Sequence, residues 1–104
     1  MKILLVCAGG LSSSIVMKKI RKYGEEKGED IQIDAVGVTE CEEAAKNDYD
    51  CVLTAPQVRN RFNELKGKVS IPIEAMPPQD YAIGNAENIV KLAKKIINNN
   101  EVIE

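Results

Sequence analysis

The residues best suited to carry out a reaction form one loop, Cys7-Ala8-Gly9-Gly10-Leu11-Ser12-Ser13-Ser14. This loop follows a short apolar run and precedes a helical stretch. Two glycines relieve steric limits, so successive backbone N–H groups can turn toward one point and form an anion-binding nest. The helix start adds its partial positive charge, and the three serines add hydroxyl donors. The loop therefore predicts a site for a phosphate-sized anion.

A thiol stands at the first position of this loop. The thiolate is the nucleophilic form of cysteine, and a helix N-terminus favours it. The residues thus suggest that Cys7 attacks phosphorus and carries a phosphoryl group on sulfur, with the loop amides around its oxygens. This hypothesis needs the sulfur to face the loop and not the hydrophobic interior. The alternative is a small buried residue before an ordinary strand-to-helix turn.

A second reading of the loop is a phosphatase, because low-molecular-weight tyrosine phosphatases use Cys, five residues, then Arg. Ser13 stands at that arginine position, and the first arginine of the chain is Arg21. An arginine there would clamp the phosphoryl oxygens and stabilise the transition state. Asp80 is the one loosely placed candidate for the acid that a phosphatase also needs. Without the arginine a phosphocysteine should hydrolyse slowly, which suits a carrier.

The composition excludes several other chemistries. The 104 residues contain no histidine, so a Ser-His-Asp or Cys-His hydrolase, histidine-ligated zinc and a phosphohistidine on this chain are excluded. Cys7, Cys41 and Cys51 contain no C-x-x-C pair, so neither a disulfide framework nor a zinc site is expected. The net charge of −2 leaves no basic excess to neutralise phosphates, so a general nucleic-acid binder is excluded. We expect no metal and no cofactor.

The elements that must position the loop alternate between strands and helices. Strands are expected at 3–6, 31–36, 51–55 and 71–75, and helices at 12–27, 39–46, 58–66 and 85–98. This alternation predicts a single α/β domain over 1–104, with a four-stranded parallel sheet, helices on both faces and the phosphate-binding loop after strand 1. The period-two pattern of 31–36 and the proline at 72 favour edge strands, which fits the order 2-1-3-4.

Local signals refine these boundaries. Thr39 with Glu42 fits a capping box, and Asn85 is expected to cap the last helix. Residues 77–80 are expected to form a rigid loop, and residues 99–104 a frayed tail. No signal peptide and no apolar stretch of membrane-spanning length is visible, and the cysteine usage indicates a reducing, cytoplasmic location without direct membrane insertion.

The loop resembles the phosphorylation loop of the enzyme IIB components of the lactose/cellobiose (chitobiose) family of the bacterial phosphoenolpyruvate-dependent sugar phosphotransferase system. That pattern is Cys, two residues, Gly, one residue, then Ser-Thr-Ser; Gly10, Ser12 and Ser14 match, and Ser13 replaces Thr. A second match is Val52-Leu53-Thr54-Ala55-Pro56-Gln57, which is similar to the third strand of the family ending in Pro-Gln. Tyr81 also matches, whereas Ala82 and Asn85 depart from the family's usual Gly and Asp.

The resemblance implies a phosphoryl carrier in sugar uptake. Cys7 would accept a phosphoryl group from a phosphohistidine on a IIA protein and pass it to a sugar, such as cellobiose, chitobiose or lactose, in a membrane IIC partner. Residues 8–14 would bind the phosphoryl group, and Pro56 and Gln57 would support the loop from the end of the third strand. A phosphatase-like or arsenate-reductase-like thiol enzyme, and a regulatory module that only holds an anion, remain the alternatives.

Charge gives a further hypothesis about docking. Lys18, Lys19, Arg21 and Lys22 form a basic patch on the first helix. These cations can steer a IIA or IIC surface toward the loop. The simpler interpretation is a solvated helix face.

Overall fold

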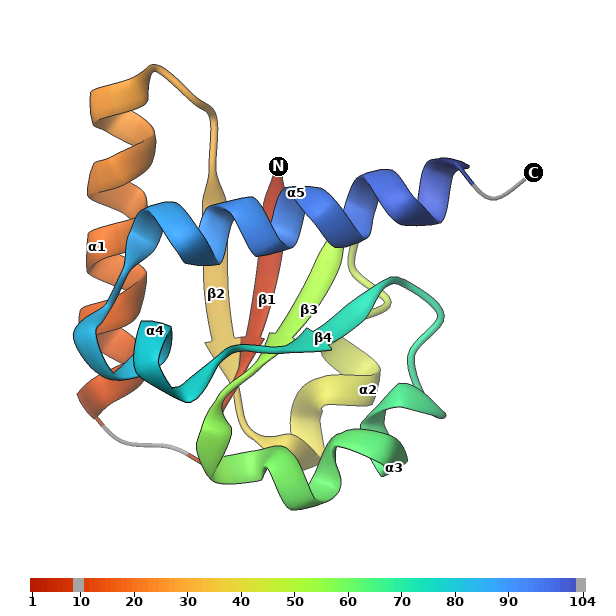
Figure 1. Ribbon diagram of the computed structural model, residues 1–104. Coiled ribbons are helices and arrows are strands. Elements are labelled where there is room, and N and C mark those ends of the chain that lie inside the picture. Colours follow the sequence, from red (N-terminus) through yellow and green to blue (C-terminus); the bar gives the residue numbers. More distant parts are fainter. Residues whose placement is uncertain (9–10, 103–104) are drawn as a thin grey trace.

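Figure 1 shows the chain as a computed structural model that describes residues 1–8 and 11–102. The elements are β1 (Lys2–Val6), α1 (Leu11–Lys27), β2 (Gln32–Val36), the 3₁₀ turn η1 (Val38–Glu40), α2 (Cys41–Ala44), β3 (Cys51–Thr54), the 3₁₀ segment η2 (Pro56–Arg61), α3 (Phe62–Lys66), β4 (Ile73–Ala75), α4 (Pro78–Ile83) and α5 (Ala86–Val102). Among these residues no helix is both long and apolar enough to cross a membrane.

The four strands form one parallel sheet in the order β2-β1-β3-β4, as predicted. β1 and β3 occupy the centre because their apolar runs are buried on both faces, which suits a parallel sheet covered on both sides. β2 lies at one edge, where Gln32 and Asp34 face solvent and Ile33 is buried. β4 lies at the other edge, and Val52 donates its N–H to the carbonyl of Pro72 just before it.

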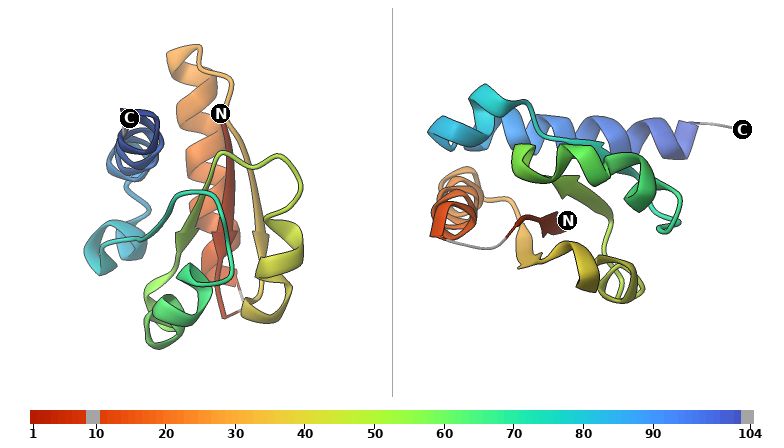
Figure 2. Two further views of the ribbon diagram at one scale, coloured as in Figure 1. Left: turned by 90° about the vertical axis from the view of Figure 1, so that its right-hand side faces the viewer. Right: turned by 90° about the horizontal axis from the view of Figure 1, so that it is seen from below.

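Helices cover both faces of the sheet (Figure 2). Successive side chains of a strand point to opposite faces, so Ile3 and Leu5 pack in one core and Leu4 and Val6 in the other. The first core is closed by α1, α4 and α5, and the second by α2, η2 and α3. The predicted arrangement of helices on both faces is therefore confirmed.

Three local predictions were wrong. Residues 77–80 do not form the rigid loop that was predicted but begin α4, because proline is accepted in the first turn of a helix, where no N–H bond is needed. Gly37, and not Thr39, starts the turn after β2, since its N–H donates to the carboxylate of Glu40 at 3.0 Å. The last helix continues to Val102 instead of ending at 98.

Other boundaries agree or differ in detail. Asn85 caps α5, because its side-chain Oδ1 accepts the N–H of Asn88 at 3.1 Å. The helix expected at 58–66 is divided into η2 and α3, with Val58 outside helical geometry. Because of this division, the residues that follow Pro56 run across the carboxyl end of the sheet, where the predicted site lies.

Candidate functional site

Cys7 directly follows β1, at the carboxyl end of a central strand. Its N–H donates to the carbonyl of Val36 at 3.0 Å, and its Sγ lies 3.8 Å from the same oxygen. The residue is 6 % exposed and belongs to the core on the α1 and α5 side. Cys7 also borders an open cavity, so it lies at the boundary between the core and the surface.

The loop after Cys7 is described in part. Gly9 and Gly10 lie outside the described residues, as do the side chains of Leu11 and Ser12. Ala8 is exposed, Ser13 is buried and Ser14 is exposed. The start of α1 at Leu11 places a helix N-terminus four residues after the thiol, as the anion-site prediction requires.

A cavity of about 610 Å³ opens at the carboxyl end of the sheet. It is lined from three places in the sequence, by Cys7, Ala8, Gly37, Val38, Thr39, Glu40, Gln57, Val58, Asn60 and Arg61. Because the carboxyl ends of parallel strands meet at one edge, the loops after β1, β2 and β3 surround it together. Gln57 therefore lies in the same cavity as Cys7, whereas Pro56 lines a neighbouring groove.

Glu40 is the acid among the described residues that line this cavity. Its carboxylate accepts the N–H of Gly37 at 3.0 Å and the hydroxyl of Thr39 at 2.6 Å. These bonds, first that of Thr39, lower the pKa of Glu40, so the group stays ionised. A Cβ atom at position 37 would lie 2.7 Å from Glu40 Oε1, so any other residue there would have to shift the end of the Glu40 side chain.

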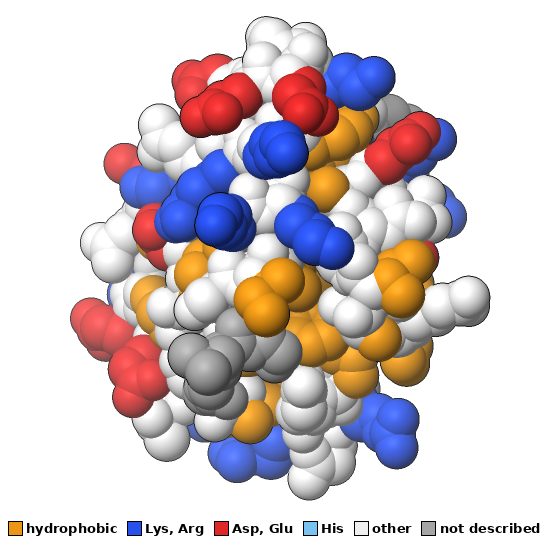
Figure 3. All heavy atoms as spheres, turned by 90° about the vertical axis from the view of Figure 1, so that its left-hand side faces the viewer, with side chains coloured by type: hydrophobic (Ala, Val, Ile, Leu, Met, Phe, Trp, Pro, Cys, Tyr) orange, Lys and Arg blue, Asp and Glu red, His pale blue; other side chains and the backbone are white. Residues whose placement is uncertain are grey.

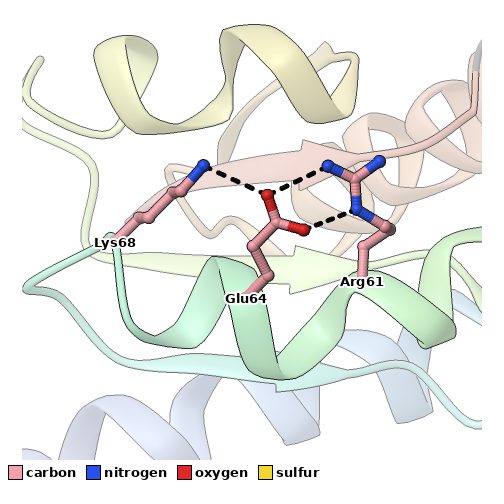
Figure 4. A network of polar contacts seen from close by, with 3 residues as sticks. All are labelled: Arg61, Glu64 and Lys68. Atoms are coloured by element: carbon pink, nitrogen blue, oxygen red, sulfur yellow. Dashed lines mark hydrogen bonds and ion pairs between the residues drawn. The ribbon is translucent and has the colours of Figure 1, made fainter.

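Arg61 is the cation among the described residues that line the cavity. Figure 4 shows its guanidinium held by Glu64, with Nε donating to Oε1 at 2.7 Å and Nη2 to Oε2 at 3.0 Å, while Lys68 donates to Oε2 at 3.1 Å. The bonds from Arg61 and then Lys68 lower the pKa of Glu64 to about 2. The bidentate pair holds the guanidinium of Arg61 in a defined orientation at the cavity that Cys7 also lines.

The other candidate groups lie elsewhere. Asp80 accepts a hydrogen bond from the side-chain amide of Asn88 at 3.0 Å and does not line the cavity of Cys7. Cys41 and Cys51 are fully buried in opposite cores, and burial raises the pKa of Cys51 to about 12. Among the described residues no group of three or more His, Cys, Asp or Glu side chains is arranged to hold a metal ion.

Sequence reasoning missed Glu40 and Arg61. The sequence could have indicated Glu40, because the loop after β2 begins beside the loop after β1 when the two strands are parallel neighbours. Arg61 had none, since the division of the predicted helix at 58–66 into η2 and α3 decides where its side chain points.

The fold and the cavity define a class: a small parallel α/β domain with a thiol at the carboxyl end of its first, central strand. Residues 2–92 match the sequence model of the family described as "PTS system, Lactose/Cellobiose specific IIB subunit". The chain therefore belongs to the lactose/cellobiose-specific IIB family of the phosphotransferase system (PTS), whose members are phosphotransferases in sugar uptake that work with IIA and IIC partners.

Similar proteins agree with this assignment over nearly the full chain. The oligo-beta-mannoside-specific EIIB component of Bacillus subtilis is 29 % identical over 101 residues, covering 94 % of this chain and 97 % of that protein. The galactose-specific EIIB component of Lactococcus lactis is 27 % identical, with 92 % and 95 % covered.

Solved structures share the architecture. The cellobiose-specific IIB protein of Borrelia burgdorferi is 37 % identical with a TM-score of 0.80, covering 95 % of this chain and 93 % of that one. The lactose-specific IIB domain of Streptococcus pneumoniae has the same fold, with a TM-score of 0.73 at 20 % identity and 88 % and 95 % covered.

Proposed function

We propose that this chain is a cytoplasmic phosphoryl carrier, in which Cys7 accepts a phosphoryl group from a phosphohistidine on a IIA protein. The carrier then passes the group to a sugar bound by a membrane IIC protein. The observation that carries this proposal is the position of Cys7, the one cysteine of the three that borders a cavity at the carboxyl end of the sheet. Membership of the IIB family supplies the class of reaction.

The transfer proceeds in two displacements that need no further reactant. In the first, the sulfur of Cys7 attacks phosphorus, the S–P bond forms and the N–P bond breaks. The bonding pair returns to the imidazole of the donor, which gains the proton that the thiol loses. In the second, a sugar hydroxyl oxygen attacks phosphorus, the O–P bond forms, the S–P bond breaks and the proton of the hydroxyl returns to sulfur.

Positioning and charge are the main requirements of such a transfer. Residues 8–14 form the phosphoryl-binding loop in this proposal, with backbone N–H groups and the start of α1 around the phosphoryl oxygens. Arg61 adds a fixed cation to the same cavity. Pro56 and Gln57 hold the neighbouring turn at the end of β3, and Gln57 presents an amide to the cavity.

The acceptor in this proposal is a β-linked disaccharide such as cellobiose, chitobiose or lactose. Its support is the family description, and the relatives named for cellobiose and for oligo-beta-mannosides. Sugar selection belongs to the IIC partner in this scheme, because the described cavity must accept the phosphoryl group and not the whole sugar.

The test is phosphorylation of the purified chain by phosphoenolpyruvate, the general PTS components and a cognate IIA protein, followed by intact-mass spectrometry. We expect a mass increase of one phosphoryl group in the native chain and in Cys51→Ser, the matched control, and none in Cys7→Ser. Undiminished phosphorylation of Cys7→Ser would end the proposal. Rapid hydrolysis of p-nitrophenyl phosphate by the native chain would favour a phosphatase instead.

A further inference from the structure

Two charged side chains of opposite sign, Glu40 and Arg61, line the cavity that Cys7 also lines. Glu40 lies in the turn after β2, and Arg61 ends η2, the segment that follows β3. The other described residues of the lining are uncharged, and residues 8–14 of the loop contain no Asp, Glu, Lys or Arg. The charge on the described walls of this cavity therefore comes from one carboxylate and one guanidinium.

The carboxylate of Glu40 is held in place by its own turn. It accepts the N–H of Gly37 at 3.0 Å and the hydroxyl of Thr39 at 2.6 Å. Gly37 directly follows Val36, whose carbonyl oxygen accepts the N–H of Cys7 at 3.0 Å and lies 3.8 Å from its Sγ. A short series of bonded neighbours therefore joins the thiol to this carboxylate, and the negative charge keeps a defined position relative to the sulfur.

The guanidinium of Arg61 is held by Glu64 through two of its nitrogens, Nε and Nη2. Glu64 also accepts the Nζ of Lys68 at 3.1 Å, so the three side chains together carry one positive charge. The third nitrogen of Arg61, Nη1, takes no part in these contacts (Figure 4). Because a guanidinium has five N–H donors in a fixed arrangement, Arg61 keeps donors for a further anion while Glu64 orients it.

A group of cations on α1 lies outside this cavity. Figure 3 shows Lys and Arg side chains gathered on this face of the molecule, where Lys18 and Lys22 are exposed. Lys19 and Arg21 each donate a hydrogen bond to a backbone carbonyl of another element. None of these four cations lines the cavity of Cys7. The basic patch predicted on the first helix is therefore separate from the charges of the cavity.

The two charges of the cavity have opposite effects on a phosphoryl group. Such a group on a side chain carries close to two negative charges at neutral pH. A nearby cation stabilises it, and a nearby carboxylate destabilises it. We propose that Glu40 and Arg61 set the phosphoryl-transfer potential of Cys7 in opposite directions, Arg61 holding the phosphoryl group and Glu40 promoting its release. This inference rests on the proposed function, in which the carrier must give up the group that it accepts.

The first measurement reports the charge that acts on the sulfur without any phosphoryl transfer. Iodoacetate is an anion and iodoacetamide is neutral, and both alkylate the same thiolate, so the ratio of their rates at Cys7 cancels the fraction of thiolate. At low salt we expect Glu40→Gln to raise the iodoacetate-to-iodoacetamide ratio about twofold, and Arg61→Gln to lower it by a similar factor. At about 0.5 M salt both differences should largely disappear, because the charges are screened.

Matched controls separate these local charges from the charge of the whole chain. Glu26→Gln and Lys66→Gln remove an exposed acid and an exposed cation that do not line the cavity, so both variants should keep the native ratio. Glu40→Gln retains a side-chain oxygen that can accept the N–H of Gly37, so the turn is preserved. Arg61→Lys keeps the cation and should restore most of the native ratio, which loss of the bidentate geometry alone would not do.

The second measurement is the equilibrium between the phosphorylated IIA protein and the chain, read by intact-mass spectrometry. A phosphoryl dianion carries twice the charge of iodoacetate, so the equilibrium constant should change by the square of the change in the alkylation ratio. We expect Glu40→Gln to shift the equilibrium about fourfold toward the phosphorylated chain, and Arg61→Gln about fourfold away from it.

Three results would overturn the proposal. These are equal alkylation ratios in all variants, shifts of the same sign in Glu40→Gln and Arg61→Gln, and an unshifted phosphorylation equilibrium despite shifted alkylation ratios. In the last case the two charges would act on the thiol but not on the phosphoryl group. Failure of the native chain to become phosphorylated would remove the proposed function itself, and this result is distinguishable because the alkylation ratios do not depend on phosphoryl transfer.

Discussion

Among the residues that the structure describes, the buried hydroxyl of Thr54 has no hydrogen-bond partner. The residue is fully buried at the carboxyl end of β3, where it stands in register with Val6 of β1 and Ala75 of β4. A buried polar group without a partner costs about 1–3 kcal/mol of folding free energy. Thr54→Val replaces the hydroxyl by a methyl group of the same shape, and valine suits a central strand.

We therefore expect Thr54→Val to raise the free energy of unfolding by about 1 kcal/mol, toward the lower end of that range. For a domain of this size the gain corresponds to an increase in Tm of about 4–8 °C. Urea unfolding followed by circular dichroism checks this value, and an unchanged m-value would show that the unfolded state is the same. Because Thr54 does not line the cavity of Cys7, phosphorylation of the variant should proceed normally.

The matched control is Thr39→Val. The hydroxyl of Thr39 is exposed and donates to Glu40 at 2.6 Å, so its loss should give no gain in stability. An unfolding free energy of Thr54→Val equal to or below that of the native chain would refute the reasoning, as would an equal gain in the control.

Two further predictions concern thiol reactivity and acid stability. Iodoacetamide at about pH 8 should modify Cys7 before the others, because Cys41 and Cys51 are fully buried and burial raises the pKa of both thiols; peptide mass spectrometry checks this order, and equal rates at the three thiols would contradict it. The bonds from Arg61 lower the pKa of Glu64 from 4.5 to about 2, so the stabilisation by this carboxylate is complete above about pH 4.5 and is lost as the pH falls toward 2. Glu64→Gln should flatten the acid-induced loss of stability in that interval, less so at high salt because the pair is exposed, and an identical pH profile would contradict the assignment.

The order of the elements was accessible from the sequence because it depends on local patterns. Continuous apolar runs predict central parallel strands, and the alternation at 31–36 predicts an edge strand, as the structure confirms. The cap of the last helix at Asn85 was predicted correctly, because capping involves residues only a few positions apart. The cap predicted at Thr39 was wrong because the turn begins two residues earlier, at Gly37, whose N–H donates to the carboxylate of Glu40.

The anion-binding loop that the glycines and serines predict stays a prediction. The position of Cys7 after the central strand followed from the sequence, whereas the surroundings of the thiol did not. Glu40 and Arg61 line the cavity of Cys7 although they lie 33 and 54 positions farther along the chain. Ile15 and Ile83 line one groove, and Lys19 donates a hydrogen bond to the carbonyl of Ile83 beside it. Periodicity and turn chemistry specify which face a side chain takes within its own element. Which elements then share an edge, and which of their side chains meet there, is decided only when the sheet brings its carboxyl ends together.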